Sequence, residues 1–427
     1  MRRTAFFVIL TATLIPAAAS RAQVTVFPPV FGTGNGVYID AEGTLHQRQT
    51  DTANDLATQR LRTKALNQPP KAQDLTYISL PRLFAEVQSL TEQKKELSDN
   101  LRYLSGLTQI RYVFVYPDEH DLVIAGPSEA FDATIKTEPH GKVTGRPVLH
   151  LDDLVTALRN PRTFGCSLDP NPDSLNRSNA AMKEFASATR GERMNALKEA
   201  VGAQQVRLFG VPADTRIAFV TIAADYKLKR LMLGLDSMPV PGVGLAVDNS
   251  RAAANRFWFE LNYAPLLVSP DGDAYELRGQ RLLIKPGAFS TDTKGATETT
   301  KTFAKNFTAK IPQLATVVPL FADLQNIADL SVVSALIHKD RLERKSGVDF
   351  GWILSESNYK AMSVPTPRTA ETLVNYTNGS LVAGGVTLDP SGVVAANNRE
   401  RDAKEALKPL KGRPSSDNWT HTKAPAK

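Results

Sequence analysis

Cys166 is the only cysteine of the 427-residue chain, and it lies in the segment FGCSLDPNPD. A thiol becomes a nucleophile when a histidine takes its proton and a carboxylate orients that histidine. His150 or His140 would be the base here, and Asp152 or Asp153 the orienting group. However, no glycine turn of the kind that builds an oxyanion hole surrounds Cys166, and unpaired cysteines are commonly buried. We therefore expect an apolar packing role, with an intermolecular disulfide or a catalytic thiol as alternatives.

Asp225 is a further candidate for chemistry, because it falls where AADYKLKR passes from a predicted strand into a predicted helix. A carboxylate at such a junction either caps the helix or stands in a cleft. Metal and nucleotide motifs do not occur. The six histidines form no HExxH or HxH pair, one cysteine forms no CxxC pair, and GxxxxGK[ST] and GxGxxG are incomplete. We expect no metal site and no cofactor.

The basic excess of the chain lies at its two ends. The net charge is +7, with 51 Lys and Arg against 44 Asp and Glu. Three arginines fall within residues 1–22, and eight basic and four acidic residues within 399–427, so residues 23–398 hold 40 of each sign. Because nucleic-acid binding needs a basic face, we expect no nucleic-acid partner. One cysteine allows no disulfide within the chain, so burial of apolar side chains must stabilise the fold.

The first 22 residues have the three parts of a secretory signal peptide. Arg2 and Arg3 precede the apolar run AFFVILTATLIPAAA, and the small residues Ser20 and Ala22 suit cleavage before Gln23. The run is shorter than the roughly 20 residues that a membrane-spanning helix needs. We predict a cleaved signal peptide at 1–22, export to the periplasm or the cell surface, and no transmembrane segment after cleavage.

The chain divides into a main folded unit between two β-rich arms. Residues 23–74 form the N-terminal arm, with a hairpin in VYIDAEGTL, and residues 75–345 form the main unit, with a sub-boundary near 161–175. Residues 346–398 carry short β signals, and residues 399–427 have no periodicity, which predicts a disordered basic tail. Because helical and strand patterns alternate irregularly, we expect an α+β fold with helices packed on antiparallel or mixed sheets.

The series Leu83, Val87, Leu90, Lys94, Leu97, Leu101 and Leu104 recurs at alternating steps of four and three residues, with Lys94 as one charged interruption, and predicts one amphipathic helix. Its apolar face would pack on a sheet or pair with a second copy of the chain. Residues 319–337 are apolar on several faces and predict a central buried helix. Other helices are predicted at 152–159, 173–190, 192–201 and 226–235, and one that is bent or ended by Pro312. Strands are predicted in IRYVFVY, DLVIAG, QVRLF, RIAFVTIAAD, RFWFELN and the meander APLLVSPDGDAYELRGQRLLIKPG.

Two distant segments resemble each other. GNGVYIDAEGTL near the N-terminus and GGVTLDPSGVV near the C-terminus share a strand, an Asp-x-x-Gly turn and a second strand. Hairpins of this kind are frequent, so coincidence is the alternative explanation. We predict that both segments lie on one sheet and bring the ends of the chain together.

Several segments also resemble a known family. FGCSLDP, VRLFGVPADTR, ADYKLKRLMLGLD, AYELRGQRL and FADLQNIADLSVVSALI stand in the same order as in exported planctomycete proteins that carry domain of unknown function 1598. The resemblance runs from about Leu75 to Leu336. It implies export, one folded unit over 75–345 and a fixed place for Cys166. The family has no established activity, so the resemblance implies no catalytic residue.

Taken together, these features favour a non-catalytic binding or assembly module of the cell envelope, whose partner is a protein or an envelope component. The alternative is an extracytoplasmic hydrolase with a dispersed site built from Cys166 and His150 or from carboxylates such as Asp152 and Asp225. A self-associating structural protein is the third hypothesis. Convergence of those groups on one cleft would favour the hydrolase, and core-facing positions would favour the binding module.

Overall fold

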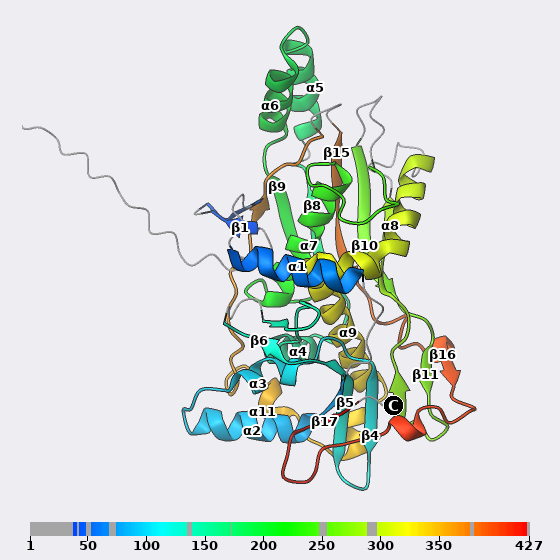
Figure 1. Cartoon of the computed structure of the whole chain (residues 1–427). Coiled ribbons are helices and arrows are strands. Elements are labelled where there is room, and N and C mark those ends of the chain that lie inside the picture. The colour runs from blue at the N-terminus through cyan, green and yellow to red at the C-terminus, as the bar shows by residue number, and fades with distance from the viewer. Residues whose placement is uncertain are drawn as a thin grey trace, which may run out of the picture.

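The computed structural model describes residues 37–40, 42–47, 53–67, 74–134, 139–171, 173–246, 254–287, 297–375 and 380–424. The predicted signal peptide lies outside the described residues. Two large mixed sheets and the helices packed on them confirm the predicted α+β fold (Figure 1). Each sheet takes strands from distant parts of the chain, so neither sheet corresponds to one continuous segment of sequence.

The first sheet holds the strands from both arms and from the middle of the chain. Its strand order in the described residues is β1 (Val37–Ile39), β2 (Thr44–Gln47), β14 (Thr369–Ala370), β9 (Gln204–Phe209), β8 (Phe164–Asp169), β15 (Leu381–Leu388), β10 (Ala254–Asn262) and β13 (Arg281–Gly287). The pairs β2–β14 and β10–β15 are parallel, and the other neighbours are antiparallel.

The second sheet is built around the predicted pair of strands in IRYVFVYPDEHDLVIAG, which is confirmed. Its order is β16 (Arg399–Arg401), β11 (Leu266–Val268), β12 (Ala274–Glu276), β4 (Tyr112–Tyr116), β5 (Asp121–Ser128), β3 (Asp74–Ser79) and β17 (Thr420–Lys423). Only β11–β16 is a parallel pair among these described strands. A small ribbon joins β6 (Phe131–Asp132) to β7 (His140–Gly141).

The predicted central helix is confirmed as α9 (Pro319–Lys339). Every side chain from Leu320 to Ile337 is buried, and α9 packs against α4, α7, α8 and β13. Its length and apolarity alone would also suit a membrane span, but all of that apolar stretch lies inside the protein. The other helices are α1 (Ala53–Leu66), α2 (Leu80–Glu92), α3 (Asp99–Arg102), α4 (Leu151–Arg159), α5 (Ser174–Glu184), α6 (Arg190–Val201), α7 (Arg216–Met232), α8 (Glu298–Val317), α10 (Leu342–Ser346) and α11 (Gly351–Leu354), with short 3₁₀ turns at Leu104–Gly106, Ala396–Asn398 and Lys408–Leu410.

The prediction of one helix over Leu83–Leu104 is wrong. Helix α2 ends at Glu92, and Lys94 has a φ of +56°, a left-handed conformation that stops the helix. The side chain of Ser98 then accepts a hydrogen bond from the Leu101 N–H and starts the separate helix α3. The apolar face of α2 is buried against β3, β5 and α11, as expected for packing on a sheet.

The predicted strand RIAFVTIAAD is also wrong, because it is the first half of helix α7. An apolar run fits a buried strand or a buried helix, since a helix buried on every side has no polar face to mark its period. Thr215 resolves the choice here: its hydroxyl accepts a hydrogen bond from the Ala218 N–H at 3.3 Å and caps the helix. Helix α7 packs between α9 and the strands β8 and β15.

The predicted meander after β10 is divided between the two sheets. The hairpin of β11 and β12 belongs to the second sheet, and β13 returns to pair with β10 in the first. In the helix that follows, α8, Pro312 neither ends nor interrupts the helical run, which continues to Val317. The proline leaves the Thr308 carbonyl without its usual helical donor, and the Gln280 side chain donates to that carbonyl at 2.9 Å instead.

The hairpin predicted in VYIDAEGTL is confirmed, and it shares the first sheet with the segment that resembles it. The Gly43 N–H donates to the Asp40 carbonyl at the turn between β1 and β2. The C-terminal segment is the central strand β15 followed by turns, so the second hairpin was predicted wrongly. Glycine is needed there: a Cβ atom on Gly384 would lie 1.7 Å from the Phe257 carbonyl oxygen.

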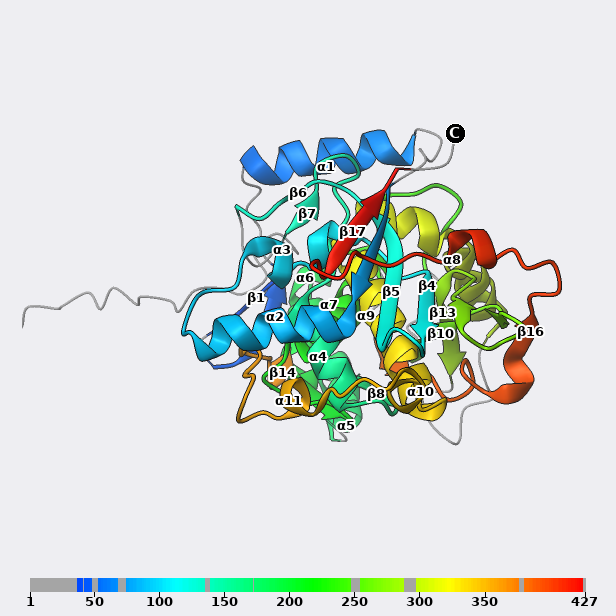
Figure 2. The same cartoon turned by 90° about the horizontal axis from the view of Figure 1, so that it is seen from below.

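The predicted disorder of residues 399–427 is wrong for the part that the structure describes, which ends at residue 424. Strand β16 pairs with β11, and β17 pairs with β3 at the edge of the second sheet (Figure 2). Between them, Asp402 accepts hydrogen bonds from the N–H groups of Ala406 and Leu407. The order comes from contacts with distant residues, which the local composition does not reveal.

Candidate functional site

Cys166 is a buried packing residue, as predicted. It lies on β8, pairs with Val386 of β15 and has no exposed surface. Burial raises the pKa of its thiol well above the ordinary value, and the nearby carboxylate of Asp225 adds to this rise. A thiol with a raised pKa carries almost no thiolate at neutral pH, so Cys166 is unsuited to nucleophilic attack.

Asp225 does not cap a helix and does not line a cleft. It lies in the middle of α7 and forms an ion pair with Lys229 at 2.7 Å, with both side chains 1% exposed. Lys229 also donates to the Leu168 carbonyl of β8 at 3.1 Å. Burial raises the pKa of Asp225, although the lysine opposes that rise. This pair joins α7 to the first sheet inside the core.

Asp153 is held in a second buried cluster, at the interface of α4, α7 and α9. The Arg216 guanidinium bridges Asp153 at 2.5 Å and Asp323 at 2.6 Å. Burial raises the pKa of Asp153 to about 6 in spite of the neighbouring Arg216. We refer to Asp153, Arg216 and Asp323 as the buried triad.

His150 and Asp152 lie beside Asp153 at the start of α4 and are also held by contacts within the protein. His150 precedes α4 and packs edge-on against the Tyr103 ring, with a centroid distance of 5.2 Å. Burial, with the charge of Arg216, lowers the pKa of His150 well below its ordinary value, which keeps the ring neutral. Asp152 accepts a hydrogen bond from the Tyr359 hydroxyl at 2.7 Å. His140 lies in the small β6–β7 ribbon.

The structure therefore separates the residues that the sequence singled out into two places. Cys166 and Asp225 are buried where β8 and α7 pack together, whereas His150, Asp152 and Asp153 lie at the start of α4. A thiol and its base have to be within hydrogen-bond reach of each other, and this arrangement does not provide that. The described residues also contain no group of three or more His, Cys, Asp or Glu side chains placed to hold a metal ion.

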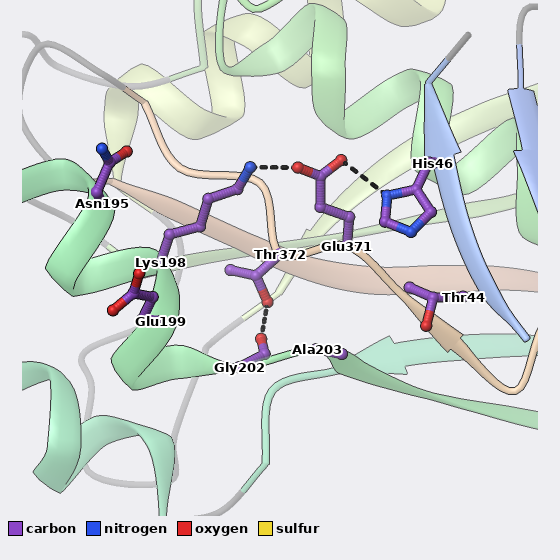
Figure 3. Close-up of a pocket in the computed structure, with 9 residues that line it drawn as sticks. All are labelled: Thr44, His46, Asn195, Lys198, Glu199, Gly202, Ala203, Glu371 and Thr372. Atoms are coloured by element: carbon purple, nitrogen blue, oxygen red, sulfur yellow. Dashed lines mark hydrogen bonds and ion pairs between the residues drawn. The ribbon is translucent and has the colours of Figure 1, made fainter. Parts of the chain in front are cut away.

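A pocket of ≈ 310 Å³ lies elsewhere, where α6 meets the edge of the first sheet (Figure 3). Sequence reasoning did not identify it. Its walls come from strand β2, from one face of α6 and the residues after it, and from the chain just beyond β14. The lining residues are Thr44, His46, Asn195, Lys198, Glu199, Gly202, Ala203, Glu371 and Thr372.

Glu371 is the centre of the polar wall of this pocket. Its carboxylate forms an ion pair with Lys198, accepts a hydrogen bond from the Tyr226 hydroxyl at 3.2 Å and lies 3.6 Å from His46 Nδ1 (Figure 3). His46 Nε2 contacts Asp40 at 2.7 Å. Burial would raise the pKa of Glu371, but the hydrogen bond and charge of Lys198 outweigh it, so the pKa is lowered and the group is ionised.

Local sequence explains how α6 presents its pocket face. Thr189 and Glu192 form a capping box that starts the helix. The helix then buries one apolar face, Met194, Leu197 and Val201, in a small core with Val374. Asn195, Lys198 and Glu199 follow the helical spacing of three and four residues on another face, which borders the pocket.

The end of α6 closes the floor of the pocket. Gly202 has a φ of +69°, which terminates the helix, and its carbonyl accepts a hydrogen bond from the Thr372 hydroxyl. Strand β14 brings Glu371 and Thr372 to this point, and the Glu371 N–H donates to the Leu45 carbonyl at 3.0 Å. Thr44 on β2 is hydrogen-bonded to Thr369 of β14 through their hydroxyls at 2.8 Å. The pocket is thus rigidly anchored on the sheet side.

One contact of this site could be predicted from the sequence, and another could not. Asp40 and His46 flank the turn of a hairpin that was correctly predicted, so their proximity follows from the strand pairing. Lys198 and Glu371 are 173 residues apart. No local pattern indicates that contact, because it depends on the position of β14 between β2 and β9.

A family model described as "Protein of unknown function (DUF1598)" matches residues 166–244. This supports the resemblance to that domain family over β8 to α7, a stretch that contributes the α6 wall of the pocket. The planctomycete origin stays a prediction, as does the resemblance outside residues 166–244. No curated protein and no solved structure matches the chain.

Proposed function

We propose that this chain is an exported, non-catalytic binding module of the cell envelope, and that the α6 pocket is its ligand site. The observation that carries the proposal is the contrast between two sets of polar groups. Cys166, His150, Asp153 and Asp225 are buried in packing or ion pairs, and Asp152 is bonded to Tyr359, whereas the pocket presents fixed hydrogen-bonding groups to solvent. A small concave site with a few fixed polar groups is typical of ligand binding.

The polar groups of the pocket suit recognition of a ligand. The carboxylates of Glu371 and Asp40 have lowered pKa values and are paired with Lys198 and His46, so neither carboxylate is poised to take up a proton at neutral pH. Its hydroxyls belong to Thr44 and Thr372, and each already takes part in a hydrogen bond within the protein. The hydrolase alternative rests on Cys166, His150, Asp152 and Asp225, and none of these four residues lines the pocket.

Export and envelope location rest on the signal-peptide pattern of residues 1–22, with its basic start, apolar run and small residues before Gln23. The absence of an intrachain disulfide is compatible with an oxidising compartment, since Cys166 is shielded from oxidants. The partner that we propose on this basis is a soluble or surface component of the envelope, bound in the periplasm or on the cell exterior.

Native mass spectrometry tests the binding proposal. The mature chain is mixed with the small-molecule fraction released by digestion of the envelope, and bound mass is compared with that of the Asn195→Leu variant. We expect a ligand adduct on the wild type that the variant loses, and recovery of that ligand with unchanged mass. A chemically converted ligand would contradict the non-catalytic assignment, and an equal adduct on the variant would contradict the site. Cell fractionation, with 1–22 deleted as the control, tests export.

A further inference from the structure

The charges of the α6 pocket are already matched within its wall. Lys198 is paired with Glu371, and the His46 ring lies between Asp40 and Glu371. Asp40 is itself held ionised: burial would raise its pKa, but hydrogen bonds from the Thr44 N–H and from His46 lower it. Beyond these matched charges, Glu199 also lines the pocket and adds an exposed carboxylate.

This arrangement disfavours a ligand of either charge. An anionic group placed against Lys198 would meet Glu371 and Glu199 at short range, and like charges repel there. A cationic group placed against Glu371 would be repelled by the Lys198 ammonium, which is paired with that carboxylate. Among the charged residues that line the pocket, Glu199 is the exposed one. An ion pair between a cationic ligand and this exposed carboxylate would contribute little to the binding free energy. A neutral ligand avoids both penalties.

The polar side chains of the pocket wall still have both hydrogen-bond donors and hydrogen-bond acceptors to offer a ligand. The Lys198 ammonium has three N–H donors and uses one on Glu371. Thr372 donates its hydroxyl hydrogen to the Gly202 carbonyl and keeps its acceptor lone pairs. Asn195 offers an amide donor and acceptor, and Glu199 offers acceptors. A hydroxyl group satisfies either kind of partner, because it donates and accepts at once.

The remaining surface of the pocket suits C–H groups of a small ring. Ala203, the methyl groups of Thr44 and Thr372, and the methylene stem of Lys198 supply it. The volume of ≈ 310 Å³ is at the lower end of the range of about 300–1,000 Å³ for small-molecule sites. Resting on the proposed function of this pocket, we infer that its ligand is a neutral saccharide of one or two rings.

Saturation-transfer NMR on the mature full chain tests this inference with matched probes. The probes are glucose, galactose and mannose, each beside its 2-amino sugar and its uronic acid, which keep the ring but replace one hydroxyl-bearing group by an ammonium or a carboxylate group. We expect at least one neutral hexose to bind about tenfold or more tightly than both of its charged counterparts, because only the charged forms meet like charges in the wall.

Variants show whether the hexose that gives the NMR signal binds in the α6 pocket. Asn195→Leu removes a hydrogen-bonding amide at the pocket and is expected to weaken hexose binding about tenfold, whereas Glu199→Gln replaces a carboxylate by an amide that still accepts a hydrogen bond and is expected to weaken it by less. Asn179→Leu and Glu184→Gln make the same changes on α5 at exposed positions outside the pocket, and leave binding unchanged. Thermal unfolding shows whether each variant is folded.

The outcomes separate the two proposals. Pocket-dependent binding of a charged analogue equal to or tighter than its neutral parent overturns the saccharide inference and leaves the binding module in place. Binding that the α5 variants reduce as strongly as the α6 variants overturns the site. If none of the neutral or charged probes binds, the saccharide inference fails, and the adduct experiment alone then decides the proposed function.

Discussion

The buried triad and the α6 pocket use the same kinds of side chain for opposite purposes. In the triad, the Arg216 side chain is 11% exposed and its two aspartates 4% each. In the pocket, Lys198 is 31% exposed and Glu371 27%. A charge removed from water needs a partner in the protein, whereas a half-exposed charge keeps part of its hydration. The triad therefore joins three helices, and the pocket retains capacity for a further molecule.

This comparison makes the removal of Arg216 the largest expected effect. Arg216→Met leaves Asp153 and Asp323 buried without a cation, which we expect to lower the free energy of unfolding by about 3–5 kcal/mol. Urea denaturation at pH 7 measures it. Arg207→Met, at an exposed position on β9, is the matched control and should stay within about 0.5 kcal/mol of the wild type. A loss below 1 kcal/mol for Arg216→Met would remove the distinction between the two regions.

Breaking the buried ion pair between Lys229 and Asp225 should cost somewhat less stability, and a second substitution should restore part of that loss. Lys229→Met leaves Asp225 alone in the core and should cost about 3 kcal/mol in the same unfolding experiment. Adding Asp225→Leu removes the uncompensated charge, so the double variant should be more stable than Lys229→Met. If the double variant is no more stable than Lys229→Met, the pair stabilises the fold through packing and not through charge compensation.

The pH dependence of stability distinguishes the triad further. The pKa of Asp153 is about 6 in the folded chain against 3.8 for an ordinary aspartate. Between these values the folded state binds more protons than the unfolded state, so this group makes stability fall as the pH rises from about 4 to 6, by at most about 3 kcal/mol. Asp153→Asn should remove that fall. Urea unfolding at several pH values measures it, and identical slopes in both proteins would refute the assignment.

The pKa values of Glu371 in the pocket and of Asp40, which contacts the pocket residue His46, affect stability with the opposite sign. Their pKa values are lowered, so their contribution to stability is present above the unfolded pKa values of 4.5 and 3.8 and is lost as the pH falls through the folded ones. Both groups are unchanged in Asp153→Asn. The difference between the two proteins therefore isolates Asp153.

The smallest effect is expected in the pocket itself. Lys198→Met should lower the free energy of unfolding by less than about 1 kcal/mol, because Tyr226 and His46 still contact Glu371 and water reaches the carboxylate. The same urea experiment measures it. A loss as large as that of Arg216→Met would show that Lys198 is a structural residue, and the pocket would then belong with the triad.

The parts of the fold that depend on local composition and spacing could be predicted from the sequence. The buried state of Cys166, the central position of α9 and the hairpin at Asp40 follow from local composition and spacing, and these predictions are confirmed. The helix over Leu83–Leu104 failed because leucine spacing continues across Lys94, whose left-handed backbone breaks the helix without any apolar signal. The strand at 216–225 failed because a fully buried helix has no polar face.

The candidate site was harder to predict than the fold. The sequence drew attention to reactive residue types, Cys166, His150, Asp152 and Asp225, and the structure places all of them in packing or internal bonds. The pocket is built from residue types that are common on any surface. Its polar wall arises only when β14 sets Glu371 opposite Lys198, and that pairing of distant segments is a property of the topology.

Strand β17 sets the order in which the fold can be completed. Thr422 is hydrogen-bonded to Thr76 of β3, a contact that closes a loop of 346 residues. Residues as far as β17 must therefore be synthesised before this strand can pair with β3. Contacts of such long sequence separation form slowly, because the loop entropy is lost before the contact forms. If the chain is exported as we propose, late completion of the second sheet would keep it unfolded for longer, as passage through a translocation channel requires.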